Sequence, residues 1–86
     1  MNHYRTTDMA LAAYLNLHGH THQKLEIRPG KWGPECVWVF RESEPLRILD
    51  ESFLGGNAQV EPKTYLLKVA AVRQEMFDFL DNHNDG

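Results

Sequence analysis

Glu35-Cys36-Val37-Trp38-Val39-Phe40-Arg41 is the densest run of β-branched and aromatic residues in the chain, and these residue types favour a β-strand. Cys36, Trp38 and Phe40 fall on one face of such a strand, and the two valines between them fall on the other. A strand with one face in water alternates apolar with polar residues. We therefore expect helices to cover one face of this strand and a further element, such as a second subunit, to cover the other.

The residues before this run predict a partner strand. Residues 23–28 alternate cleanly, so we expect Leu25 and Ile27 to point to the core and the charged residues around them to point to water. Residues 29–34 are dense in Pro and Gly, which mark a turn. The two strands are expected to form an antiparallel hairpin whose loop is longer than the tight two-residue kind.

A first helix is predicted between Thr7 and Gly19. Thr7 is the expected N-cap, and Asp8 is the expected first helical residue, where a carboxylate suits the positive end of the helix dipole. Gly19 is expected to stop the helix in a left-handed conformation. The inward face, read from helical spacing, consists of Leu11, Tyr14, Leu15 and His18. Residues 1–5 are expected to be a flexible arm.

Two more helices are predicted after the central strand. Ser43 is a candidate N-cap for a short helix, and Gly55 is expected to end it. Pro62 suits the first position of a longer helix, because proline has no N–H to leave unpaired there. Residues 82–86 are expected to be a flexible tail. The inward stripe of the short helix consists of Leu46, Leu49 and Phe53.

The last helix carries more apolar residues than one buried face requires. One broad face consists of Leu66, Val69, Ala70, Arg73, Phe77 and Leu80. The adjacent face consists of Tyr65, Val72, Met76 and Phe79. The predicted order of elements is α-β-β-α-α, which is an α+β fold with an antiparallel hairpin packed on helices.

Length and composition fit a single domain over residues 1–86. Of its 86 residues, 42% are hydrophobic and 24% are charged, as in an ordinary small globular protein. Cys36 is the only cysteine, so no disulfide forms within the chain, and the cytoplasm is a better fit than secretion. The first residues have no apolar signal core, and no apolar run approaches the ~20 residues of a membrane span.

The charge distribution gives little basis for nucleic-acid binding. The net charge is −3, and the basic residues are outnumbered in the second half of the chain. Phosphate contacts need clustered Lys and Arg. One basic and aromatic group does gather around the predicted hairpin, where it would bind single-stranded nucleic acid by phosphate contact and stacking. It consists of Lys24, Arg28, Lys31, Trp32 and Arg41.

Three histidines within five residues, His18, His20 and His22, are candidate ligands for Zn²⁺ or Ni²⁺. His20 and His22 would share one face of a strand. A metal site normally takes a further carboxylate or thiolate ligand, and the sequence does not identify one. The alternative is that His18 ends the first helix, where its charge suits the dipole, while the other two are solvated loop residues. No cofactor is expected.

Cys36 is a candidate nucleophile that one of the histidines would activate. A catalytic thiol needs access and an activating neighbour, whereas the middle of an apolar strand favours a buried structural role. The segment Gly30-Lys31-Trp32-Gly33 lacks the strand-loop-helix context of a phosphate-binding loop. We therefore expect a protein that is not an enzyme.

The segment Thr6 to Leu15, TTDMALAAYL, resembles the opening of a family of small uncharacterised domains from bacteria and their phages. Members of that family open with T-[ST]-D-x-x-L-A-A-[FY]-L. The later matching positions are Val37 to Phe40, Ser43, Gly55 to Val60, and Pro62. The resemblance spans residues 5–80. It implies no known activity, substrate or catalytic residue, and it points to an origin in a phage or mobile element.

The leading hypothesis is a cytoplasmic, non-enzymatic protein-interaction module that forms a homodimer. This hypothesis rests on the surplus of apolar side chains, which a small domain is expected to bury in an interface. The expected contact residues are Trp32, Trp38, Phe40, Met76 and Phe79. The alternatives are a nucleic-acid-associated accessory protein, using the basic hairpin, and a small metal-binding protein, using the three histidines.

Overall fold

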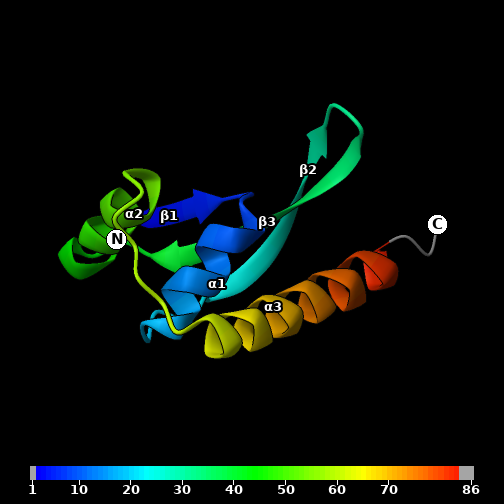
Figure 1. Cartoon of the computed structure of the whole chain (residues 1–86). Coiled ribbons are helices and arrows are strands. Elements are labelled where there is room, and N and C mark those ends of the chain that lie inside the picture. The colour runs from blue at the N-terminus through cyan, green and yellow to red at the C-terminus, as the bar shows by residue number, and fades with distance from the viewer. Residues whose placement is uncertain (1, 84–86) are drawn as a thin grey trace.

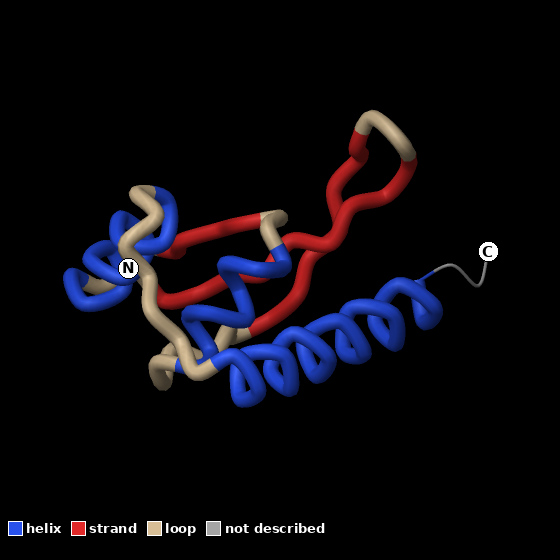
Figure 2. The backbone as a smooth tube through the Cα atoms, viewed as in Figure 1, coloured by secondary structure: helices blue, strands red, loops and turns tan. Residues whose placement is uncertain are grey.

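The computed structural model describes residues 2–83 and has the α+β fold that the sequence predicts (Figures 1 and 2). Three strands form one antiparallel sheet in the order β1-β3-β2, and three helices accompany it. The elements are β1 (His3–Thr6), α1 (Met9–Leu17), β2 (Lys24–Gly30), β3 (Gly33–Arg41), α2 (Glu44–Leu54) and α3 (Pro62–His83). The predicted hairpin and the helices on one face of it are confirmed, with one additional strand at the start of the chain.

The additional strand is β1, and the expectation of a flexible arm over residues 1–5 is wrong for residues 3–5. Tyr4 lies opposite Phe40 in the β1–β3 register, and the centroids of their rings are 6.5 Å apart. The Tyr4 hydroxyl also donates a hydrogen bond of 2.8 Å to Asp50 Oδ1 on α2. Burial and this carboxylate raise the pKa of Tyr4. One aromatic side chain therefore anchors β1 to both the sheet and α2.

The β2–β3 turn is tighter than expected. Gly30 pairs with Gly33, so only Lys31 and Trp32 lie between the two strands. Gly33 has φ +121°, a backbone conformation that residues with a side chain rarely adopt. A glycine at this position therefore permits the tight turn. The hairpin extends beyond the rest of the sheet, as Figure 1 shows. The expectation of a longer loop is therefore wrong.

Helix α1 covers the face of β3 that carries Trp38 and Phe40, and the residues of α1 from 11 to 15 are all buried there. Asp8, rather than the expected Thr7, is its N-cap. The Oδ1 atom of Asp8 accepts hydrogen bonds from the N–H groups of Ala10, at 3.0 Å, and of Leu11, at 3.3 Å. Asp8 thereby satisfies two donors that the first turn of a helix leaves unpaired.

The other face of β3 is covered by charged side chains of the same chain. Val37 and Val39 on this face are only 5% and 0% exposed. Arg5 on β1 lies opposite Val39, and Glu26 on β2 lies opposite Val37, so the 3.0 Å ion pair between Arg5 and Glu26 crosses above β3. The Lys24 Nζ atom forms a second ion pair with Glu26, at 3.3 Å from its Oε2 atom. The apolar stems of these side chains shield the valines, and no second subunit is needed there.

The two remaining helices begin where the sequence predicts. Ser43 caps α2, with its Oγ accepting from the N–H of Leu46 at 3.3 Å. Glu61 precedes α3, and its carboxylate accepts from the N–H groups of Lys63 and Thr64. Figure 1 shows α3 running alongside α1 and continuing past it. Asn82 and His83 belong to α3 rather than to a flexible tail, and the rest of that predicted tail lies outside the described residues.

Candidate functional site

Helix α3 has one face on the core and a second apolar face in water. Val72 is buried in the core cluster, and further residues of α3 pack against it. These half-buried residues are Tyr65, Val69, Met76, Phe79 and Leu80. The predicted face with Tyr65, Val72, Met76 and Phe79 is therefore the one that packs on the core. Val69 and Leu80, from the edge of the other predicted face, also pack there.

The rest of the first face is exposed, and we call it the outer stripe. It consists of Leu66, Ala70, Arg73 and Phe77, and the exposed Leu67 lies beside it. Leu66, Leu67 and Phe77 are 66%, 67% and 50% exposed, and Ala70 is also exposed. Residues three and four apart share a face of a helix, so Leu66, Ala70, Arg73 and Phe77 form one row, with Leu67 on its flank. The row is apolar except for Arg73. Exposed apolar patches are typical of interaction surfaces, so the outer stripe is the candidate site.

The charges around the outer stripe differ between its two ends. Lys63 lies about one turn before Leu66, and Asp81 lies about one turn after Phe77. Neither Lys63 nor Asp81 takes part in an ion pair within residues 2–83. The stripe is therefore positive at its amino end and negative at its carboxyl end, and between them it is apolar except for Arg73.

Two of the five predicted interface residues are unavailable for contact with another molecule. Trp38 and Phe40 are 1% and 0% exposed, because α1 packs on the face of β3 that carries them. Their assignment to an interface is wrong. Met76 and Phe79 are half-buried and pack against the core, so they contribute at most their edges to a surface.

Trp32 is the fifth predicted interface residue, and it is 91% exposed at the tip of the hairpin. The Lys31 ammonium lies 5.4 Å from the centroid of its ring, which is a cation–π distance. The sequence marked both tryptophans as contact residues. The structure separates them, because one lies under α1 and the other lies in a turn that projects from the sheet.

The four cations predicted to contact nucleic acid do not form a basic surface. Lys24 pairs with Glu26, and Arg28 pairs with Glu35 at 3.1 Å. Lys31, in the hairpin turn, and Arg41 lie at opposite ends of β3. Neighbouring carboxylates thus offset part of the positive charge, and the remainder is spread along the sheet.

The three histidines are likewise separated. The ring of His18 meets the ring of Tyr14 edge-on at 4.6 Å, while His20 lies in the loop after α1. His22 has its Nε2 atom 2.6 Å from Glu75 Oε1 and its Nδ1 atom 3.3 Å from the Asn16 side-chain nitrogen. Within residues 2–83 no three His, Cys, Asp or Glu side chains are placed to hold a metal ion.

The role of His22 is structural, and the sequence did not indicate it. The amide nitrogen of Asn16 also donates to the Ala12 carbonyl at 2.7 Å, so the same group is a donor toward His22 Nδ1. This pattern assigns the ring proton to Nε2, which donates to Glu75 on α3. His22 thereby ties the loop after α1 to α3.

Cys36 is a buried thiol, as predicted, and its surroundings do not activate it. Burial, with a smaller contribution from the negative charge of Glu75, raises the pKa of Cys36 to about 11. The thiolate, which is the nucleophilic form, is therefore scarce at neutral pH. A cysteine nucleophile does not fit this position.

The comparisons with known proteins add no relative: the chain matches no family model, no curated protein and no solved structure. No helix within residues 2–83 has the length and apolar character needed to cross a lipid bilayer. The outer stripe is the surface feature that points most directly to a function.

Proposed function

We propose that the chain is a non-enzymatic interaction module that forms a homodimer by pairing the outer stripes of two copies. The exposure of Leu66, Leu67 and Phe77 is the observation that carries this proposal. A small domain gains free energy when such a row leaves water. Two-fold dimers are the most common assemblies of identical chains, and they use the same patch on both copies.

The sequence of the outer stripe is complementary to itself when two copies of α3 run antiparallel. With a two-fold axis near position 72, Phe77 of one copy faces Leu67 of the other and lies next to Leu66. In the same register Lys63 faces Asp81, so unlike charges meet at both ends of the contact. Ala70 and Arg73 lie on either side of the axis. The small side chain of Ala70 permits close approach of the helices, and the guanidinium of Arg73 is at the end of a long side chain that can extend to water at the edge of the contact. A parallel arrangement would instead place like charges together.

The expected affinity is modest. Helix α3 has 22 residues, which corresponds to a length of about 33 Å. A contact made by one helix from each copy lies near or below the ~1,200 Å² of total buried area typical of stable complexes. We therefore expect a dimer that dissociates in the micromolar range.

Sedimentation equilibrium of the wild type and two variants tests the proposal. The 10.0 kDa chain should approach twice that mass at high micromolar concentration. Phe77→Asp places a charge in the centre of each contact and should leave a monomer. Leu54→Asp is the matched control, because Leu54 is equally apolar and 70% exposed but lies on α2. The control should dimerise like the wild type. A wild type that stays monomeric overturns the proposal, as does a dimer that Phe77→Asp leaves intact.

We place this module in the cytoplasm, as the sequence predicts. The single cysteine is free and buried, so the fold is stabilised without a disulfide. An origin in a phage or mobile element rests only on the resemblance of residues 5–80 and stays a prediction. The genes adjacent to the coding sequence would test that origin.

A further inference from the structure

The turn between β2 and β3 carries an exposed aromatic side chain next to a cation. Trp32 is 91% exposed, and the Lys31 ammonium lies 5.4 Å from the centroid of its ring. Lys31 takes part in no ion pair within residues 2–83. Since only these two residues separate the paired Gly30 and Gly33, the hairpin holds them at its very end. We call residues 29–34 the hairpin tip.

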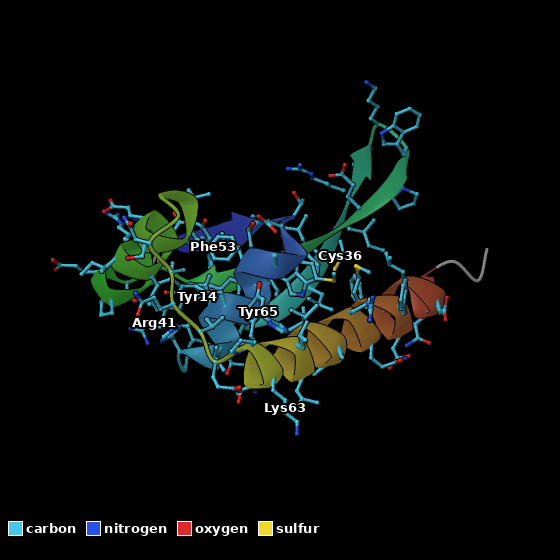
Figure 3. All side chains as sticks on the ribbon, viewed as in Figure 1. Tyr14, Cys36, Arg41, Phe53, Lys63 and Tyr65 are labelled. Carbon is cyan, nitrogen blue, oxygen red and sulfur yellow. The ribbon has the colours of Figure 1, made fainter. Side chains whose placement is uncertain are left out.

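The hairpin tip extends beyond the helices and is apolar on one face. Figure 1 shows the hairpin leaving the helices, and Figure 3 marks Cys36 at the base of this projection. Between Cys36 and the turn, the side chains of Ile27, Pro29 and Pro34 are exposed. They lie on the face of the sheet that carries Cys36, because paired residues share a face. The tip therefore adds apolar surface to the ring of Trp32.

The hairpin is the positive part of an acidic molecule. Residues 24–41 hold four basic and two acidic side chains, whereas the rest of the chain holds five basic and ten acidic ones. The hairpin tip itself has Lys31 and no carboxylate. The next residue, Glu35, pairs with Arg28 at 3.1 Å, so its charge is offset locally. A charge distribution of this kind directs the tip, rather than the helices, toward an anionic surface.

The acidic residues elsewhere lie too far from the tip to prevent such a contact. Helix α2, which contains Glu44, Asp50 and Glu51, follows the end of β3 opposite to the turn. The nine residues of β3 correspond to a length of about 30 Å, whereas charges are screened over about 10 Å at 0.1 M salt. Figure 1 also shows α3 diverging from the hairpin toward its carboxyl end. At a surface touched by the tip, attraction to Lys31 therefore exceeds repulsion from the helices.

We propose that the hairpin tip binds the surface of an anionic lipid bilayer. Trp32 inserts at the level of the headgroups, and the Lys31 ammonium lies beside lipid phosphates. Tryptophan suits this depth because its ring is mostly apolar while its N–H is polar. A two-residue turn covers much less than the ~800 Å² that each partner buries in a typical protein–protein interface, whereas a bilayer accepts a few side chains. The contact is peripheral, is separate from the outer stripe and does not depend on dimerisation.

Co-sedimentation with lipid vesicles tests the proposal. The vesicles are of phosphatidylcholine with about 30% phosphatidylglycerol, and vesicles of phosphatidylcholine alone are the comparison. The wild type should sediment with the anionic vesicles at low salt, and raising the salt should release it, because screening weakens the attraction. The fluorescence emission of Trp32 should shift to shorter wavelength on binding and should be quenched by brominated lipids. Trp38, which is 1% exposed, gives a constant background.

Variants at the tip and away from it locate the contact. Trp32→Ala and Lys31→Glu should each lower the affinity for anionic vesicles about tenfold, since each removes one of the two groups that contact lipid. Both side chains are in an exposed turn, so the fold should be retained. Lys68→Glu is the matched control, because it makes the same change of net charge at an exposed position of α3, and it should bind like the wild type. Phe77→Asp should also bind, since each copy has its own tip.

Three results would each overturn the proposal. The first is a wild type that does not sediment with anionic vesicles at about 5 mM lipid and low salt, where even a millimolar Kd would give binding. The second is an equal loss in Lys31→Glu and Lys68→Glu, because net charge rather than the tip would then control binding. The third is binding to single-stranded oligothymidylate without binding to vesicles, which would make the partner a nucleic acid. None of these results depends on whether the outer stripes pair.

Discussion

The outer face of β3 and the outer stripe of α3 look alike in the sequence but differ in the structure. Both are apolar where a water-facing surface would be polar. Val37 and Val39 are buried because Arg5 and Glu26, from the strands on either side, meet above them. Leu66 and Phe77 lie on the outer face of α3, where no strand lies on either side of them, and they stay exposed.

The difference shows what an apolar surplus in a sequence does and does not imply. A valine in a central strand has neighbours about 4.8 Å away on both sides, so long charged side chains can close over it. A residue on the outer face of a helix has only its own turns beside it. An apolar row there can be buried only by another molecule or element, whereas an apolar row in a sheet centre can be covered by side chains of the neighbouring strands.

The largest expected effect distinguishes the two surfaces by stability. Val39→Ala removes buried methyl groups and should lower the free energy of unfolding by about 1–3 kcal/mol. Leu66→Ala removes a larger side chain from an exposed position and should change it by less than about 0.5 kcal/mol in the monomer. Urea denaturation measures both changes in the free energy of unfolding. The protein concentration is kept below the dissociation constant of the proposed dimer. Equal losses would mean that the two surfaces are buried alike.

A smaller effect should come from the ion pairs above β3. Hydrogen bonds from Arg5 and Lys24 hold the pKa of Glu26 below its usual value. A carboxyl whose pKa is lowered by folding stabilises the fold above its unfolded pKa, and this contribution is lost as pH falls through its folded pKa. The melting temperature of the wild type should therefore fall more steeply on acidification below about pH 4.5 than that of Glu26→Gln. Parallel pH profiles would show that this carboxylate does not stabilise the sheet.

Local signals in the sequence predicted most of the helix and strand positions. Ser43 and Pro62 fixed the starts of α2 and α3, because a cap and a first-turn proline act within one helical turn. β1 was missed because four residues carry little periodicity, and its pairing with residues 38–41 is a long-range contact. The tight turn was missed because its two glycines, rather than its prolines, determine its length.

The candidate site was less predictable than the fold. Trp32 and Trp38 are the same residue type six positions apart, and only the packing of α1 on one face of β3 makes one buried and the other exposed. Likewise, the width of the apolar surface on α3 was visible in the sequence, but which half would face the core was not. That choice depends on contacts between α3 and α1, such as the 2.8 Å hydrogen bond from the Tyr65 hydroxyl to the Ala10 carbonyl.

The smallest expected effect concerns the charges at the ends of the outer stripe. Lys63→Glu should place like charges together at both ends of an antiparallel dimer and weaken it about threefold to tenfold, since an exposed ion pair contributes about 0.2–1 kcal/mol and the contact has two of them. Asp81→Lys should weaken the dimer similarly. The double variant restores unlike charges and should recover most of the wild-type affinity at low salt.

Sedimentation at low and high salt measures all four proteins. The differences between them should shrink as salt rises, because exposed pairs are screened. A parallel dimer would not respond in this way, because each charged residue would face its own copy. Lys63 against Lys63 and Glu against Glu repel alike, so either single variant would leave the affinity about unchanged. The recovery in the double variant therefore tests the direction of the helices as well as their contact, and it separates the charged ends of the stripe from its apolar centre.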